Sequence, residues 1–409
     1  MRPLRFVPSD QAVDTPNVVV DGSPNAGTRL TLSHWPGSPT PPDLRDDLSA
    51  QIAFHALARP ELFDGIDVVT NNHFDQDGLA SVFTLVNPES ARPRRDLLID
   101  VARAGDFGTF GSRDAARIAM TIAALDDDER TPMADLPDAY GERCGALYEW
   151  ALPRLTDVLD HPERWRDLWA DEDDHLSASL LAIESGAVRV HELADVAVFT
   201  FGDRPAQPST RFTIASGEAL HPMSLYRTTD RLLVALVRGH RYQLECRYET
   251  WVMLTSRMVT PRRDLRILAA TLDSLETSGA RWHADAPSAL TPLLHLADDH
   301  ESAWNRPSGW RRCSTSWPPH HSPGTRSHRR SHPGEVWGQA RRHRPQGFAR
   351  RIRAGPLGSH HRRPQGDGRT GLLPQHGRAG TMPTHRERHR GLGAGGQPVD
   401  LEVGALPAG

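Results

Sequence analysis

The stretch that decides the fold reads GIDVVTNNHFDQDGLAS and runs from Gly65 to Ser81. Its apolar beginning predicts a short buried strand, and the small and apolar residues at its end predict a helix. Between the two lies a polar turn that contains His73, Asp75 and Asp77. A strand that leads through a polar turn into a helix is the repeating unit of an α/β protein.

This turn carries residue types that hold a transition metal. Alternate residues of an extended segment point to the same side, so His73, Asp75 and Asp77 share one side if the turn stays extended. An imidazole nitrogen combined with carboxylate oxygens suits Mn²⁺, Fe²⁺ or Zn²⁺. We therefore predict a metal site of these three residues. Asp106, from the next predicted strand and loop, is the expected fourth ligand, with Asp100 as its substitute.

Apolar runs on both sides of the turn extend the pattern. The predicted strands are 17–21, 29–34, 66–70 and 96–101. One helix is predicted to begin after Asp43, which would be its N-cap, and another at Gly78. Further helices are predicted over 113–125 and over about 137–184. Strands that alternate with helices predict an α/β fold with a largely parallel sheet. Ligands bind such sheets outside the carboxyl ends of the strands. We therefore expect His34 and Asp106 to join the acidic turn at one edge.

The pattern changes after about residue 186. Strands are predicted over 188–191, 195–201, 232–237 and 242–246, a hairpin turn at 238–241 and a helix over 264–275. Mixed strands and helices of this kind predict a second, smaller α+β domain. The folded part would then consist of a metal-binding α/β domain, residues 1–185, and an α+β domain, residues 186–303.

Residues 304–409 differ in composition from everything before them. They are rich in Arg, His, Pro, Gly and Ser, and no apolar period would give them a buried face. One interpretation is a disordered basic tail that contacts nucleic acid through phosphates. The other is a frameshift in a GC-rich gene, which we favour because the change is abrupt. Translation of the other two reading frames distinguishes them.

The composition of the chain excludes several classes of function. The chain has no lysine, and its first 300 residues are acidic, which argues against a nucleic-acid clamp in the folded part. Its three cysteines are scattered and form neither a metal motif nor a disulfide framework. No signal peptide and no membrane-spanning run is recognised. We expect a cytoplasmic protein with no membrane partner, and the oligomeric state is left open.

The run from His73 to Ser81 resembles the first motif of the DHH phosphoesterase superfamily, which is Asp-x-Asp-Gly-x-x-Ser after a strand. The resemblance implies a parallel-sheet DHH-like domain, paired Mn²⁺ ions held by these residues and Asp106, and hydrolysis of a small phosphate ester, nucleotide or phosphoanhydride. His34 would position phosphate or act as a general acid, and Asn72 and Ser81 would help to shape the substrate site. The folded part also resembles an uncharacterised actinobacterial protein family.

The chain lacks one motif of that superfamily, and this absence leads to two hypotheses about its activity. The chain has no Asp-His-His triplet, and Asp160-His161 is followed by Pro162. The first hypothesis is a metal-dependent phosphoesterase-like enzyme, in which Arg103 contacts phosphate or forms a surface ion pair. The second is a catalytically inactive DHH-like ligand-binding or scaffold protein.

Two simpler interpretations of the acidic turn compete with a metal site. A calcium loop counted from His73 requires an acid at its first position and glutamate at its twelfth, where this chain has His73 and Thr84. A polar turn in which Asp75 and Asp77 cap the next helix requires only one aspartate. Neither explains the whole run, so we favour the metal site.

Overall fold

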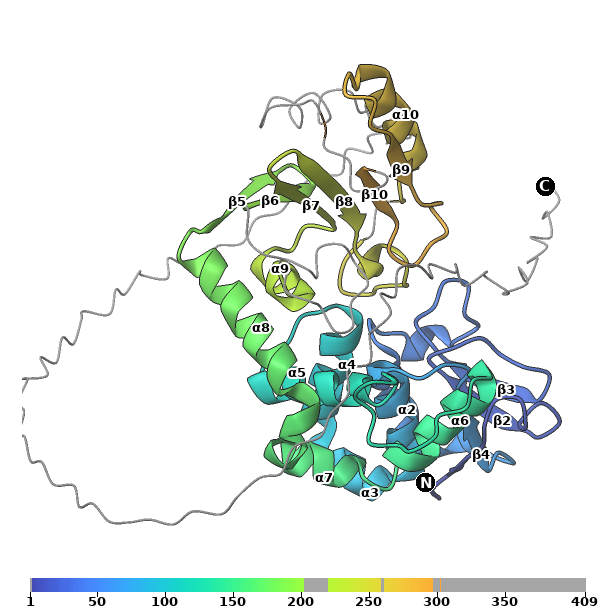
Figure 1. Ribbon diagram of the computed structural model, residues 1–409. Helices are drawn as coiled ribbons and strands as arrows, with labels where there is room; N and C mark the ends of the chain where they lie inside the picture. Colours follow the sequence, from blue (N-terminus) through green and yellow to red (C-terminus); the bar gives the residue numbers. More distant parts are fainter. Residues whose placement is uncertain (1, 202–219, 259–260, 297–301, 303–409) are drawn as a thin grey trace, which may run out of the picture. The chain divides into compact units, whose positions relative to one another are not determined.

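The computed structural model describes residues 2–201, 220–258, 261–296 and 302. The chain separates into two compact units, residues 1–323 and 324–409, and every described residue belongs to the first. Residues 202–219, 259–260, 297–301 and 303 of the predicted second domain lie outside the described residues, and so does the tail predicted over 304–409. Figure 1 labels most of the helices and strands named below.

The first sheet is parallel throughout. Its strands lie in the order β1 (Arg5–Phe6), β4 (Val68–Thr70), β2 (Asn17–Val20) and β3 (Thr28–Leu32). The valine run of β2 is buried along its whole length, as expected for a parallel strand covered on both faces. The predicted mixed α/β fold with a parallel sheet is therefore confirmed.

Helices of the first half of the chain pack around this sheet. They are α1 (Ser49–Leu57), α2 (Gln76–Val86), α3 (Pro88–Ala91), α4 (Arg95–Asp106), α5 (Arg113–Ala124), α6 (Tyr140–Ala151), α7 (Leu155–Asp160) and α8 (Arg166–Glu184). Helix α2 is buried from Gln76 to Leu85 and packs against α1 and α4, which makes it central to the core. The acidic turn therefore leads into the most enclosed helix of this half.

Two predicted elements are wrong. Residues 96–101 are not a strand, because they lie within α4, where Leu98, Val101 and Ala102 share a buried face at helical spacing. A short apolar run has no period that separates a strand from a buried helix. Asp43 caps no α-helix, because it lies in the 3-10 turn Pro42–Leu44. Helix α1 starts after Leu48, whose own side chain provides no cap.

The second sheet has six strands. Their order is β5 (Val188–Leu193), β6 (Val196–Phe201), β7 (Leu233–Arg238), β8 (Arg241–Cys246), β10 (Leu293–Leu296) and β9 (Trp282–Ala284). Among the described strands of this sheet, only the β6–β7 pair is parallel. The predicted turn between β7 and β8 is present, with Gly239 at positive φ, where glycine meets no Cβ clash.

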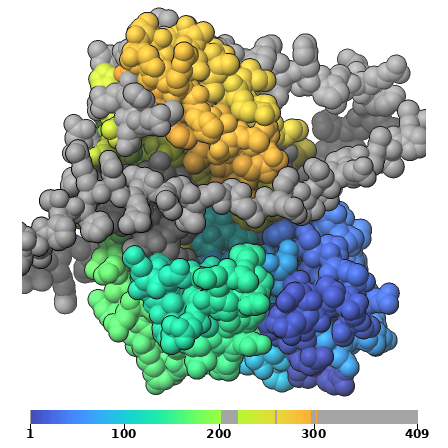
Figure 2. Space-filling model, turned by 45° about the vertical axis from the view of Figure 1, so that its right-hand side comes forward, coloured from blue at the N-terminus to red at the C-terminus, as the bar shows by residue number. Residues whose placement is uncertain are grey.

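Two helices accompany this sheet, α9 (Pro222–Thr228) and α10 (Leu265–Leu275). Asp264 caps α10 by accepting the backbone N–H of Arg266. One side of α10, drawn in yellow-orange in Figure 2, faces solvent, and Ile267 and Leu275 are exposed there. Among the described residues, no helix has the length and apolar character needed to cross a bilayer.

Candidate metal centre

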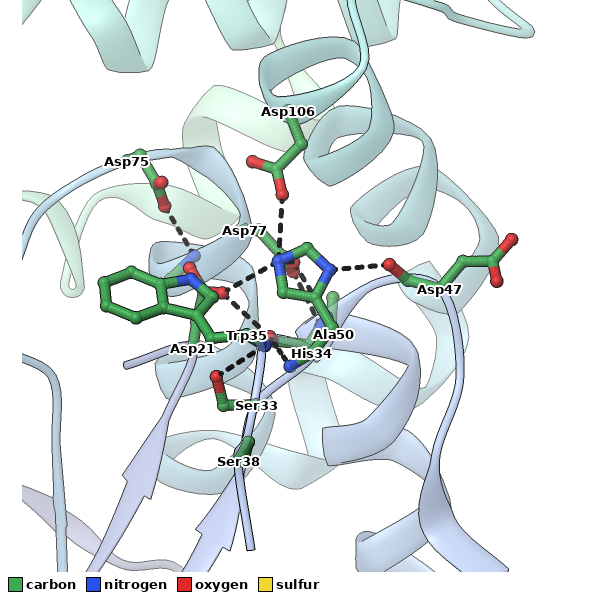
Figure 3. Close-up of polar contacts among 12 residues, drawn as sticks. Asp21, Ser33, His34, Trp35, Ser38, Asp47, Ala50, Asp75, Asp77 and Asp106 are labelled. Carbon is green, nitrogen blue, oxygen red and sulfur yellow. Dashed lines mark hydrogen bonds and ion pairs between the residues drawn. The ribbon is translucent and has the colours of Figure 1, made fainter. Parts of the chain in front are cut away.

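Six ligand-capable side chains converge at the carboxyl edge of the parallel sheet. They are Asp21, His34, His73, Asp75, Asp77 and Asp106. Three of the four strands deliver them: Asp21 follows β2, His34 follows β3, and the acidic turn follows β4. Asp106, the last residue of α4, comes from a helix instead of the predicted strand. Figure 3 shows most of this group around the His34 ring.

One half of the centre is enclosed; we call His34, Asp77 and Asp106 the closed half. The His34 Nε2 atom lies 3.4 Å from Asp106 Oδ2 and 3.9 Å from Asp77 Oδ2. Ligand atoms about 2.1 Å from one ion lie roughly 3.0–3.5 Å apart at octahedral or tetrahedral angles. The first distance fits that spacing and the second is slightly longer. With Asp21, the ligand atoms of His34 and Asp77 all lie within 4.8 Å of one another, so a cation fits among these three, and Asp106 lies beside His34.

The tautomer of His34 supports this arrangement. Its Nδ1 lies 2.6 Å from the backbone carbonyl oxygen of Asp47. A carbonyl only accepts, so Nδ1 donates to it, and the Nε2 atom that faces the carboxylates is the one that would bind a cation. Both His34 Nε2 and Asp106 Oδ2 are buried without a hydrogen-bond partner among the described residues. Buried polar atoms normally have partners, and a metal ion would supply one for both.

The other half reaches the surface; we call His73 and Asp75 the open half. The His73 Nε2 atom lies 3.0 Å from Asp75 Oδ2, and these side chains are 16% and 33% exposed. Asp75 Oδ1 accepts the backbone N–H of Gly78 and so caps α2. The ring of Trp35 lies 5.1 Å from the His73 ring, centroid to centroid. The imidazole is thereby fixed while its ligand atom stays near solvent.

Asp21 joins the two halves. Its Oδ1 lies 3.4 Å from His34 Nε2, and its Oδ2 lies 3.2 Å from His73 Nε2. Ser49 donates its hydroxyl to Oδ1. A carboxylate that turns one oxygen to each half has the geometry of a bridging ligand. Asp21 ends the predicted strand 17–21 and is not among the predicted site residues, although it directly follows the buried strand β2, as His34 and the acidic turn follow β3 and β4.

The predicted alignment of Asp75 and Asp77 is wrong. The segment is not extended, because α2 begins at Gln76. Asp77 therefore points to the start of α1, where its oxygens accept the backbone N–H groups of Ser49 and Ala50 at 2.7 and 2.6 Å. Such groups have no acceptor within their own helix. Each aspartate thus caps a different helix, and each oxygen keeps a second lone pair for a cation.

Burial and mutual repulsion perturb the acids. Burial, then the charges of neighbouring carboxylates, raises the pKa of Asp77 and of Asp106 well above the usual range. Burial also raises the pKa of Asp21, but His73 and His34 outweigh it and hold that pKa below its ordinary value. Burial lowers the pKa of His73, and the carboxylates of Asp75 and Asp21 raise it well above 6.5. Excess negative charge is therefore gathered here, which divalent cations would offset.

A segment that follows β8 covers the closed half; we call residues 247–256 the cover segment. Met253 N donates to the carbonyl of His34, and Asp47 Oδ1 accepts the N–H groups of Thr255 and Ser256. The Tyr248 ring lies 6.1 Å from the His34 ring. Burial and the nearby carboxylates raise the pKa of the Tyr248 phenol, so it stays protonated. Asp47 and Tyr248 carried no sequence signal, since only the tertiary fold brings them here.

The remaining predicted residues divide into two groups. Asn72 Oδ1 lies 3.5 Å from His73 Nδ1, so Asn72 borders the open half. The Ser81 hydroxyl is buried in α2 without a hydrogen-bond partner in the described chain. Arg103 instead pairs with Asp100 at 3.5 Å on a half-exposed surface. Asp100 accepts N–H groups at the start of α5, so neither of these two residues is brought into the centre.

The fold and the cluster define a mixed α/β protein with a histidine- and aspartate-containing group suited to metal ions. The chain belongs to the family of unknown function DUF6687, whose model matches residues 2–321. No curated protein matches the chain. The family description assigns no activity, so any catalytic activity is inferred from the geometry of the centre.

Proposed function

We propose that this chain binds two divalent metal ions, one in each half of the centre, and hydrolyses a small phosphate ester or anhydride. The observation that carries the proposal is the placement of Asp21, whose two oxygens face His34 and His73. Four carboxylates and two imidazoles provide mixed oxygen and nitrogen ligands, which suit Mn²⁺ or a related transition ion. Two such ions would balance the formal charge of the four aspartates.

The two halves would have different tasks. Paired ions supply charge stabilisation and a nucleophile of lowered pKa to phosphoryl chemistry. The closed half would hold its ion by ligands that water cannot reach, which is typical of a fixed position. The open half, with Asp75 one-third exposed, would leave room for substrate, as catalytic metal sites do. His34 would act as a ligand oriented by Asp47, which replaces the general-acid role expected for it.

The substrate would be small. The phosphorylated group must reach the open half beside His73, Asp75 and Asn72, between the Trp35 ring and the start of α2. The acidic first half of the chain disfavours a long nucleic acid. Resemblance of the acidic turn to DHH phosphoesterases supports the same substrate class.

A second candidate is an inactive relative in which the metal only holds the fold together. The closed half favours it, because the cover segment lies against His34 and Asp47 and encloses that ion position. The absence of an Asp-His-His triplet favours it too. Under this candidate, metal binds and no phosphate ester is turned over.

An activity assay on metal-loaded protein distinguishes the candidates. The full chain is saturated with Mn²⁺ and incubated with a generic aryl phosphate. We expect turnover that is lost in Asp75→Ala and in Asp77→Ala and retained in Asp160→Asn, whose side chain forms a surface ion pair with Arg94. Tight metal without turnover would support the inactive relative. Turnover that persists in both alanine variants would contradict the proposal.

A further inference from the structure

A second polar cavity lies at one end of the six-stranded sheet, apart from the residues of the metal centre. It has a volume of about 270 Å³ and is bordered by the starts of β6 and β7, the end of β8 and the start of α10. Its charged lining consists of Arg231, Arg257, Arg262, Arg263, Asp195 and Asp230. This volume is below the roughly 300–1,000 Å³ of pockets for drug-sized ligands, so its ligand would be small.

Positive charge dominates the lining. Four arginines face two aspartates, which leaves a formal charge of +2. The pairs within the lining are loose, at 3.8 Å for Arg231 with Asp230 and 3.6 Å for Arg263 with Asp195. Charge-assisted N–H···O bonds are usually about 2.7–2.9 Å long. Glu192, outside the lining, binds Arg231 at 3.1 Å. Within the described residues, neither aspartate forms an ion pair with Arg257.

Arg262 gives the cavity a fixed positive wall. Its Nε donates to the Thr250 hydroxyl at 2.7 Å, and its terminal nitrogens donate to the carbonyls of Pro287, Ala289 and Leu290. The guanidinium is thus held from several segments at once. A cation fixed in advance loses little conformational entropy when an anion binds.

Arg257 has more donors to offer. A guanidinium carries five N–H donors, and among the described residues Arg257 uses one hydrogen bond, to the Asp230 carbonyl at 3.0 Å. Its side chain is only partly buried. The planar fork of arginine matches two oxygens of a phosphate group. Arg257 can therefore close on an anion that rests against Arg262.

We propose that this cavity binds a small tetrahedral dianion, namely inorganic phosphate or the phosphate group of a small metabolite. The fixed Arg262 and the fork of Arg257 provide the charge and the donors, and the start of α10 at Leu265 borders the same space. The proposal is independent of hydrolysis at the metal centre, because it uses none of those residues.

Calorimetric titration of inorganic phosphate into the full chain after metal removal tests the proposal. Chelation excludes binding to metal. We expect saturable 1:1 binding that Arg257→Gln weakens by about tenfold or more, through loss of a charge-assisted bidentate contact. Arg257→Lys keeps the positive charge but loses the planar guanidinium group. Its phosphate affinity should therefore lie between those of the unmodified protein and Arg257→Gln.

Three controls make the outcome decisive. Arg189→Gln removes the same charge from an exposed position on β5 and should change phosphate affinity by less than twofold. Arg231→Gln removes another positive charge from the lining and should weaken binding. Acetate at equal ionic strength should bind less tightly than phosphate. Absence of saturable phosphate binding, or equal affinity in Arg257→Gln and Arg189→Gln, would overturn the proposal.

Discussion

The closed and open halves of the metal centre use the same ligand types and differ in access to water. His34 and Asp77 are fully buried, whereas His73 and Asp75 are 16% and 33% exposed. Burial of several carboxylates together is costly unless their charge is compensated. The comparison teaches that one set of ligands can serve two purposes: the closed half secures an ion, and the open half keeps a position that substrate can reach.

Replacement of the shared ligand should have the largest effect. Asp21→Asn removes the bridging charge from both halves, and asparagine tolerates the left-handed backbone of this position, where φ is 44°. We expect Mn²⁺ affinity at both positions to fall by more than the roughly 10–100-fold lost when a residue that only supports a ligand is replaced. Calorimetric titration of Mn²⁺ measures it. If the variant binds two ions with unchanged affinity, Asp21 does not bridge the two ions and is only a neighbour of the centre.

Histidine replacements separate the halves from each other. His73→Ala should leave one tightly bound ion per chain and no turnover. His34→Ala should cost the enclosed ion and lower the thermal midpoint in Mn²⁺, because the buried aspartates lose their compensation. His55→Ala, at a half-exposed histidine paired with Asp46, is the matched control. Equal metal loss in the His34 and His73 variants would show that the two halves are not distinct.

The pH dependence of stability should follow from the raised pKa values of Asp77 and Asp106. The metal-free folded chain holds protons on these acids that the unfolded chain releases near pH 3.8. The stability that these two acids contribute to the metal-free protein is therefore fully present at low pH and is lost as pH rises through the raised pKa values. The raised pKa of His73 extends the same loss above pH 6.5. The lowered pKa of Asp21 acts in the opposite direction, below pH 3.8.

Bound metal requires these acids ionised and His73 neutral, so stabilisation by Mn²⁺ should grow as pH rises. Thermal midpoints with Mn²⁺ and with a chelator, measured between about pH 5 and 8, give the difference directly. Asp106→Asn should flatten the curve of the metal-free protein. A difference that is constant or shrinks with rising pH would contradict the assignment of these acids as ligands.

The smallest predicted effect concerns support of the closed half. Asp47→Ala frees the N–H groups of Thr255 and Ser256 but keeps the backbone carbonyl that orients His34. We expect about a tenfold loss of Mn²⁺ affinity, at the low end for supporting residues. Asp43→Ala, a nearby exposed acid paired with Arg59, should have none. Matching effects in the two variants would assign the Asp47 result to general surface charge.

Much of the fold could be predicted because its strands are apolar runs bounded by polar turns. The runs that became β2, β3 and β4, and most of the second sheet, were recognised on that basis. The run at 96–101 was misassigned as a strand because it is short and its helical face becomes clear only over the whole of α4. The local pattern of apolar residues therefore predicts short strands bounded by turns. It fails for a helix whose buried face is visible only over its whole length.

The candidate site was only partly predictable for a different reason. His73, Asp75 and Asp77 stand together in the sequence, so their chemistry is visible there. Asp21 and Asp47 are ordinary turn residues until the sheet brings them to His34. Conversely, Arg103 is near Asp106 in sequence yet pairs with Asp100 on the surface. Convergence of distant strand ends is a tertiary property that local spacing does not encode.

The most direct test is the number of metal ions bound per chain. Purified full-length protein is saturated with Mn²⁺, freed of excess ion by gel filtration and measured by elemental analysis. The arrangement of Asp21 between His34 and His73 predicts two ions per chain. A chain that retains none would contradict the metal centre and, with it, the proposed hydrolysis.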